Sequence, residues 1–225
     1  MSLFSTELVE RIHKARVMAV LVVDRAEDGG PLAEALLCGG VNAMELTLRT
    51  AVAIDVLKAV RAKVPEMLVG VGTVLTREQV RQGADAGAAF GMAPGLNPKV
   101  LEEAARSGLP FAPGVATPSD IEAALELGCQ ELKFFPAEPI GGIRYLRALA
   151  SPYTHRKLRY IPLGGINADN ARDYLADPLV LAVGGSWIAS QTLIQQRDWK
   201  TITQRAAEAS RIIAECEKVS WASGS

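Results

Sequence analysis

The 225-residue chain repeats one unit along its length, a short apolar run followed by a longer amphipathic segment. The runs are apolar throughout and do not alternate with polar residues, which is typical of parallel strands buried on both faces. We predict strands at 17–23, 42–48, 67–74, 89–93, 110–115, 132–135, 158–163 and 180–183. Strand-then-helix units at nearly even spacing predict an α/β fold, a closed (β/α)8 TIM barrel. The alternative is an open doubly wound sheet, but no GxGxxG motif follows the first strand.

The segments between the strands have helical periodicity and recognisable ends. We predict helices at 31–38, 50–63, 76–86, 98–107, 117–127, 143–150, 167–175 and 199–218, and an additional N-terminal helix at 4–14. Thr117 and Pro118 start one of them as cap and first helical residue, and Gly108 ends another. We expect one domain over residues 1–225, with the N-terminal helix inside 1–16 and a mobile tail at 219–225.

Composition and charge exclude several classes of partner. Hydrophobic residues make up 49% of the chain, and the formal net charge is -1. No basic block offers a surface for nucleic acid or anionic lipid, and no apolar run approaches a membrane span. The first residues carry Glu7, Glu10 and Arg11 in an amphipathic pattern, unlike a secretory signal. We therefore expect a cytoplasmic protein without nucleic-acid or membrane partners.

The cysteines and histidines form no metal site in the sequence. Cys38, Cys129 and Cys216 are isolated and odd in number, so they form neither a disulfide framework nor a zinc spacing. His13 and His155 have no neighbouring ligand at a metal-binding interval, and we expect both at the surface. The sequence predicts no metal and no cofactor.

One lysine stands in the middle of an apolar, β-prone stretch at 131–138. Pro136 ends this run, because proline cannot continue a strand's hydrogen-bond ladder. Burial removes the hydration of an ammonium group and favours the neutral amine, which is a nucleophile toward carbonyls. The structural alternative for Lys133 is a residue at a strand end whose head reaches into solvent.

In a barrel of this type the active site gathers at the carboxyl ends of the strands. The residues predicted there are Glu45, Thr47, Arg49, Thr73, Pro94, Gly95, Lys133, Phe135, Gly164, Gly165, Gly184, Gly185 and Ser186. Each alone has a structural explanation, such as a Glu45–Arg49 ion pair, a cap at Thr73, or tight turns at the glycines. Together they offer a nucleophile, an acid/base carboxylate, an arginine for a substrate carboxylate and two glycine-rich turns for phosphate.

Five runs in this order carry a resemblance to a known family: ELTLRT at 45–50, GVGTV at 70–74, LKFFPAE at 132–138, PLGGI at 162–166 and VGGSW at 183–187. Over nearly the whole chain the sequence resembles the 2-keto-3-deoxy-6-phosphogluconate (KDPG) aldolases, a family that includes 4-hydroxy-2-oxoglutarate (KHG) aldolase activity. The resemblance implies a class I, Schiff-base aldolase that cleaves KDPG to pyruvate and glyceraldehyde 3-phosphate. It also implies a cytoplasmic homotrimer without a metal, and leaves open cleavage of KHG to pyruvate and glyoxylate.

The resemblance assigns roles to individual residues. Lys133 matches the Schiff-base lysine and Glu45 the acid/base. The substrate contacts are matched by Arg49 and Thr73 at the pyruvate carboxylate, by Phe135 near the imine, and by Pro94 and Leu163. The phosphate seat is matched by Gly164, Gly165, Gly185 and Ser186.

Two positions depart from the family pattern. Leu163 stands where a threonine commonly precedes the Gly-Gly pair, and Ala93 where a serine commonly precedes Pro-Gly. Leucine offers no hydroxyl to the substrate, so the stereochemical preference at C4 stays open, and with it a 2-keto-3-deoxy-6-phosphogalactonate aldolase activity. Two further alternatives are a phosphate-binding barrel isomerase or epimerase, which needs no imine, and a non-catalytic barrel that binds a phosphorylated ligand.

Overall fold

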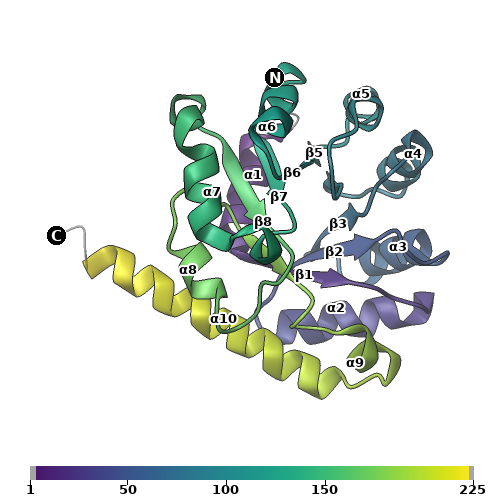
Figure 1. The fold of residues 1–225 in the computed structure, drawn as a ribbon. Helices are drawn as coiled ribbons and strands as arrows, with labels where there is room; N and C mark the ends of the chain where they lie inside the picture. Colours follow the sequence, from purple (N-terminus) through teal and green to yellow (C-terminus); the bar gives the residue numbers. More distant parts are fainter. Residues whose placement is uncertain (1–3, 223–225) are drawn as a thin grey trace.

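Helices surround a central set of parallel strands in the computed structural model, which describes residues 4–222 (Figure 1). The strands are β1 (Val17–Leu21), β2 (Ala43–Thr47), β3 (Leu68–Gly72), β4 (Gly91–Met92), β5 (Phe111–Ala112), β6 (Gly114–Val115), β7 (Glu131–Phe134), β8 (Arg159–Pro162) and β9 (Val183–Gly185). Every strand pairing among the described residues is parallel. The chain therefore has the mixed α/β fold with a parallel sheet that its uniformly apolar strands predict.

The strands form two hydrogen-bonded groups. One has the order β5-β4-β3-β2-β1-β9 and the other β6-β7-β8. β5 and β6 are two pieces of one predicted strand, divided at Pro113, which has no N–H for the ladder. At the far edge, Leu163 directly after β8 makes an isolated parallel bridge to Gly184 of β9.

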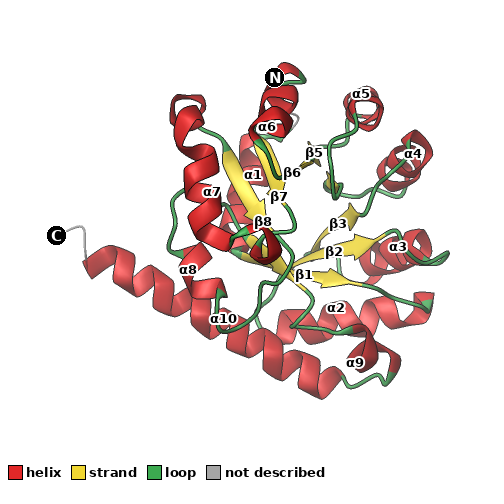
Figure 2. Cartoon of the chain, viewed as in Figure 1, coloured by secondary structure: helices red, strands yellow, loops and turns green. Residues whose placement is uncertain are grey.

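Figure 2 shows the helices arranged around the strands. They are α1 (Thr6–Ala15), α2 (Gly29–Cys38), α3 (Ala53–Lys63), α4 (Arg77–Asp85), α5 (Pro98–Ser107), α6 (Pro118–Glu126), α7 (Gly142–Ala150), α8 (Ala171–Leu175), α9 (Gln191–Gln195) and α10 (Trp199–Ala222). The 3-10 helices are η1 (Ala26–Asp28), η2 (Glu138–Ile140) and η3 (Ser151–Arg156). Within residues 4–222, no helix combines the length and the hydropathy needed to cross a bilayer.

Capping side chains set several helix starts. Thr76 accepts a hydrogen bond from the backbone N–H of Gln79, whose side chain returns one to the cap residue. Thr117 and Asp120 form the same reciprocal capping box at the start of α6. Gly108 ends α5 in the left-handed conformation, as predicted.

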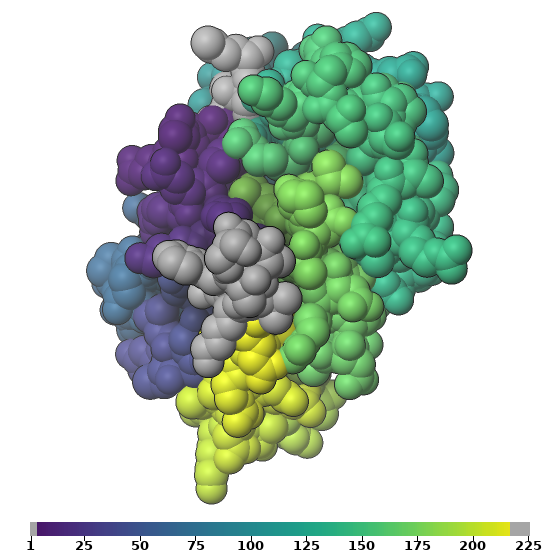
Figure 3. All heavy atoms as spheres, turned by 90° about the vertical axis from the view of Figure 1, so that its left-hand side faces the viewer, coloured from purple at the N-terminus to yellow at the C-terminus, as the bar shows by residue number. Residues whose placement is uncertain are grey.

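The buried apolar side chains form two clusters. The larger, the outer cluster, lies between the strands and the outer helices. The smaller, the inner cluster, joins α1, through Leu8 and Ile12, to residues at the beginnings of strands, such as Met18, Ala43 and Leu68. α1 therefore covers the amino ends of the strands, and Figure 3 shows this purple segment beside green segments from the second half of the chain.

Several elements differ from their predicted bounds, and one helix was not predicted. The eighth strand was predicted at 180–183, but β9 begins at Val183, where pairing with Val17 of β1 starts, and Val180 makes only an isolated bridge. The helix predicted from Asn167 begins at Ala171, because Asn167 and Asn170 accept each other's backbone N–H groups in a turn. α9 was not predicted. Residues 219–222 of the predicted tail continue the backbone of α10, and 223–225 lie outside the described residues.

Candidate active site

Lys133 occupies the middle of β7 and is buried, with 4% of its surface exposed. Its neighbours Leu132 and Phe134 belong to the outer cluster under the helices. Because side chains alternate along a strand, Lys133 points to the opposite, inner side of the sheet. The solvent-reaching alternative for this lysine is therefore wrong.

Glu45 reaches the same inner space from β2. Its neighbours Met44 and Leu46 pack under the helices, which directs Glu45 inward by the same alternation. Oε1 of Glu45 lies 3.1 Å from Nζ of Lys133, and the side chain of Glu45 is fully buried. Oε2 of Glu45 has no hydrogen-bond partner among the described residues. The pair thus holds one carboxylate oxygen against the amine and leaves the other for a further group.

Gly72 makes room for this carboxylate. A Cβ atom at Gly72 would lie 1.7 Å from Oε1 of Glu45, far inside van der Waals contact. Gly70, two residues earlier on β3, instead makes room for the ring of Phe90, since a Cβ atom there would lie 2.2 Å from that ring. Gly72 of the motif GVGTV therefore makes room for the carboxylate, a role that the sequence analysis missed because the clash depends on the pairing of β2 with β3.

Phe135 supplies the aromatic wall of the site. Nζ of Lys133 lies 5.4 Å from the centroid of its ring, within the range of a cation–π contact. Such a contact favours a positive charge on the lysine nitrogen, and a protonated imine carries that charge on the same atom.

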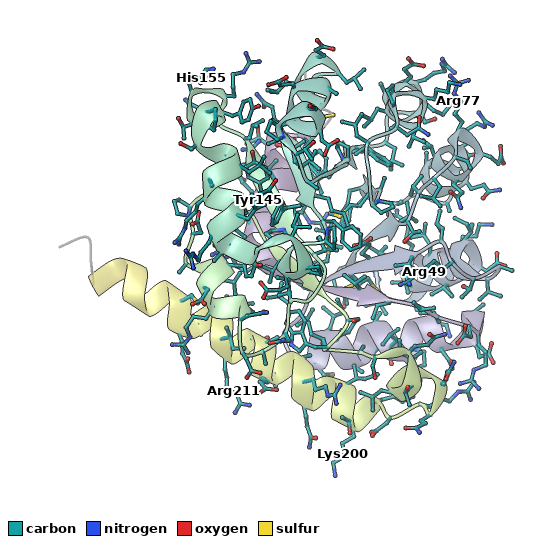
Figure 4. All side chains as sticks on the ribbon, in the orientation of Figure 1. Arg49, Arg77, Tyr145, His155, Lys200 and Arg211 are labelled. Atoms are coloured by element: carbon teal, nitrogen blue, oxygen red, sulfur yellow. The ribbon has the colours of Figure 1, made fainter. Side chains whose placement is uncertain are left out.

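Arg49 lies at the carboxyl end of β2, exposed and beside α3 (Figure 4). Its Nε donates to Oγ1 of Thr47 at 3.2 Å, and that hydroxyl donates to the carbonyl of Leu21 at 2.8 Å. Thr47 is thereby placed to orient the guanidinium. The structural alternative of a Glu45–Arg49 ion pair is wrong, since the ion pair of Glu45 is with Lys133.

Thr73 has the backbone angle φ of 56°, in the left-handed region that β-branched residues rarely adopt. It follows β3 directly and is half-buried. Strained residues of this kind cluster at functional sites, where the surrounding structure holds them in place. Pro94 is also half-buried and lies against Gly114, where a Cβ atom would come within 2.2 Å of the Pro94 carbonyl oxygen.

The predicted phosphate residues follow β8 and β9. Gly164 and Gly165 have φ values of 94° and 84°, so both use a conformation that favours glycine. A Cβ atom at Gly185 would meet the Trp187 ring at 1.9 Å, and Ser186 is exposed. Leu163 is buried, with 3% exposure, and packs with the inner cluster. A helix start at Asn167 was predicted close to these glycines. The helix α8 begins four residues later, at Ala171, so its first turn does not adjoin them.

The histidines and cysteines form no metal site among the described residues. His13 and His155 are exposed, as predicted, and His155 lies in η3 beyond α7 (Figure 4). Burial raises the pKa of the Cys129 thiol to about 11, which keeps it neutral. Among residues 4–222, no group of three histidines, cysteines or acidic residues lies close enough to hold a metal ion.

Comparison with known proteins agrees with this geometry. The family described as KDPG and KHG aldolase matches residues 8–205. A 2-dehydro-3-deoxy-phosphogluconate aldolase of Treponema pallidum is 42% identical over 92% of this chain and 97% of its own length. The chain belongs to the KDPG and KHG aldolase family.

Two solved structures of KDPG aldolases are similar to the whole fold. The Legionella pneumophila enzyme, with pyruvate captured as a covalent carbinolamine, is 38% identical with a TM-score of 0.84, covering 91% of this chain and 97% of that one. The Zymomonas mobilis ZM4 enzyme with 3-phosphoglycerate is 39% identical with a TM-score of 0.82, covering 92% and 96%. The residues that the family model matches, 8–205, include the strands that carry Lys133 and Glu45.

Proposed function

We propose that this protein is a class I aldolase that cleaves KDPG to pyruvate and glyceraldehyde 3-phosphate. The observation that carries the proposal is the buried contact of 3.1 Å between Nζ of Lys133 and Oε1 of Glu45. Membership in the KDPG and KHG aldolase family supports it, as does the carbinolamine captured in the Legionella relative. An isomerase or epimerase on this barrel would need no imine, so it does not account for a carbinolamine in a relative of this chain.

The chemistry begins at Lys133. Lys133 gives one proton to Glu45, and the free amine attacks the C2 ketone of the substrate to give a carbinolamine, which loses water to become a protonated imine. The imine accepts the electron pair of the C3–C4 bond, which breaks as the C4 hydroxyl gives up its proton. The aldehyde leaves, the resulting enamine takes a proton at C3, and water hydrolyses the imine to release pyruvate.

Glu45 serves the proton transfers in this sequence. Each one, at the carbinolamine, at the C4 hydroxyl and at C3, needs a group that gives and takes a proton near the imine. The unpaired Oε2 of Glu45 is available for that task, directly or through a water molecule. The negative carboxylate also stabilises the positively charged imine.

The other strand ends bind the substrate. Arg49 and Thr73 hold the pyruvate carboxylate, and an arginine fork suits a carboxylate in bidentate fashion. Phe135 and Pro94 line the imine. The backbone N–H groups of Gly164, Gly165, Gly185 and Ser186 form the phosphate seat. Leu163 lies one residue before that seat and faces C4 of the sugar acid, where it offers no hydroxyl.

Three broader features belong to the same proposal. The strands form a closed (β/α)8 barrel, supported by the bridge between Leu163 and Gly184 and by the division of one strand at Pro113. The enzyme is a cytoplasmic homotrimer. It also cleaves KHG, with lower efficiency, because that substrate has no phosphate to occupy the glycine-rich turns.

Trapping with borohydride tests the proposal. The protein is incubated with pyruvate and sodium borohydride, and the adduct is located by mass spectrometry of peptides. We expect a stable pyruvate adduct on Lys133, and we expect Lys133→Ala to lose both trapping and KDPG cleavage while keeping its circular dichroism spectrum. Lys157, which is exposed, serves as the matched lysine for a Lys157→Ala control. Trapping that persists in Lys133→Ala would place the nucleophile elsewhere.

A further inference from the structure

Two loops at the candidate phosphate seat are hydrogen-bonded to each other. The backbone N–H of Ala137 donates to the carbonyl of Leu163 at 2.8 Å, and that of Glu138 donates to the carbonyl of Gly164 at 3.0 Å. The loop after β7 therefore holds the loop after β8 through main-chain bonds. The sequence between these loops and the next helices is short, so each bond constrains the direction of the glycine peptides.

The side chain of Glu138 is tied down in turn. Its Oε1 accepts a hydrogen bond from the hydroxyl of Tyr174 in α8. Tyr174 is a core residue with 1% exposure, whereas Glu138 is exposed. Burial and the neighbouring carboxylates of Glu138 and Asp173 raise the pKa of Tyr174, so the hydroxyl keeps its proton and remains the donor. A rigid buried group thus anchors a surface carboxylate.

The glycines around Glu138 leave space for this arrangement. A Cβ atom at Gly165 would lie 2.5 Å from Cβ of Glu138. A Cβ atom at Gly142 would lie 2.9 Å from Oε1 of Glu138 and 3.3 Å from the Tyr174 hydroxyl oxygen. Both glycines also have positive φ angles. The absence of a side chain at Gly142 and at Gly165 therefore leaves room for the side chain of Glu138.

The carbonyl groups of Gly164 and Gly165, in the candidate phosphate seat, both accept hydrogen bonds from the protein. The carbonyl of Gly164 binds the N–H of Glu138, and that of Gly165 binds Nδ2 of Asn170 at 3.0 Å. In a trans peptide the N–H points opposite to the carbonyl of the same unit. The N–H groups of Gly165 and Ile166 are consequently directed away from Glu138 and Asn170, and an anion on that free side meets donors.

We propose that Tyr174 and Glu138 are positioning residues for the phosphate of the substrate. Tyr174 fixes Glu138, Glu138 fixes the peptide between Gly164 and Gly165, and that peptide presents its N–H to the phosphate. The hydroxyl of Tyr174 also turns the Glu138 carboxylate toward α8, which limits its repulsion of a bound phosphate. This inference rests on the proposed aldolase function, and neither residue touches the reacting atoms.

Steady-state kinetics with KDPG and with the unphosphorylated 2-keto-3-deoxygluconate tests the inference. We expect Tyr174→Phe and Glu138→Ala to raise KM for KDPG about tenfold, the worth of one hydrogen bond to a charged group, with kcat close to the parent value. KM for the unphosphorylated acid stays unchanged. Glu138→Gln keeps an acceptor oxygen for Tyr174 and retains the parent KM.

A matched control exists on the same chain. The hydroxyl of Tyr153 donates to Oε1 of Glu122 at 3.0 Å, an exposed tyrosine–glutamate pair, and we expect Tyr153→Phe to leave both KM values unchanged. Parent KM values for KDPG in both Tyr174→Phe and Glu138→Ala would overturn the inference, as would an equal rise for both substrates. A parent that does not trap pyruvate would instead overturn the aldolase function itself, so the two failures are separable.

Discussion

At the scale of single residues, the chemistry depends on how Glu45 divides its two oxygens. Oε1 faces Nζ of Lys133 at 3.1 Å, and Oε2 has no partner among the described residues. A buried polar atom without a partner is costly in a protein interior, and it is retained where a substrate or water completes its bonding. Glu45 therefore combines a fixed contact to the nucleophile with a free position for the proton that moves.

We expect Glu45→Gln to lower turnover by about 10²–10⁴-fold, the range of one general acid/base, because an amide cannot carry the proton. Pyruvate trapping suffers less, since Lys133 is intact. Release of pyruvate measured with lactate dehydrogenase gives kcat. Glu103, a buried carboxylate paired with Arg81 and Arg106, provides the control, and Glu103→Gln keeps its turnover. Turnover of Glu45→Gln within about threefold of the parent would make Glu45 a structural residue.

Gly72→Ala tests whether the missing side chain is needed. The new methyl group overlaps Oε1 of Glu45, so the carboxylate moves away from Lys133. We expect a loss of turnover similar to that of Glu45→Gln and a destabilisation of about 1–3 kcal/mol from overpacking. Gly83→Ala on α4, where the methyl group would lie 2.9 Å from Cγ2 of Val71, is the matched overpacking control. Full activity in purified Gly72→Ala would contradict the assigned position of Glu45.

We expect Leu163 to determine how well the enzyme distinguishes epimers at C4. Its apolar side chain packs with the inner cluster and gives no hydrogen bond, so we expect weak discrimination between the gluconate and galactonate substrates. Leu163→Thr sharpens discrimination by roughly 0.5–1.5 kcal/mol, the net worth of one hydrogen bond. The measurement is the ratio of kcat/KM for the two epimers, with Leu163→Val as an isosteric control lacking the hydroxyl. A parent already strongly selective for the gluconate form contradicts this role.

At the scale of helices and strands, patterns with a local physical cause were predictable. The cap at Thr117 and the stop at Gly108 depend on residues a few positions apart, and the structure confirms them. The start of α8 depends on reciprocal hydrogen bonds of Asn167 and Asn170, and it was predicted four residues too early.

Lys133 stood out in sequence because a lone lysine interrupts an apolar run. Its contact with Glu45, 88 residues away, follows from strand order and register. Gly72 and the Tyr174–Glu138 pair were missed for the same reason. Each of these contacts joins residues from separate elements, so it depends on how the fold brings those elements together.

The N-terminal helix α1 is expected to support the strands without contributing to the reaction. Ile12 of α1 is fully buried in the inner cluster, so Ile12→Ala destabilises the protein by about 2–5 kcal/mol through lost burial and a cavity. Urea unfolding measures this change. Arg11→Ala, at an exposed position of the same helix, is the control. We expect both variants to trap pyruvate while folded, and a selective loss of trapping in Ile12→Ala would give α1 a direct part in the site.

At the scale of the whole molecule, we expect three chains to associate into a homotrimer. Leu75, just beyond Thr73, is 52% exposed, and a subunit contact at this position would cover its side chain. We expect a particle of three times the 23.9 kDa chain mass in sedimentation equilibrium. A monomer at micromolar concentration would remove the trimer from the proposal.

The coverage of the amino ends of the strands by α1 has a consequence for the order in which products leave. Met18 and Ile161 belong to the apolar cluster that joins α1 to the strands, so we expect substrate to reach Lys133 from the carboxyl ends of the strands. After cleavage, pyruvate is still bound to Lys133 as the enamine, so the proposed aldehyde product departs first and pyruvate second. Added pyruvate should therefore inhibit cleavage in competition with the substrate, because both form an imine with the same free lysine.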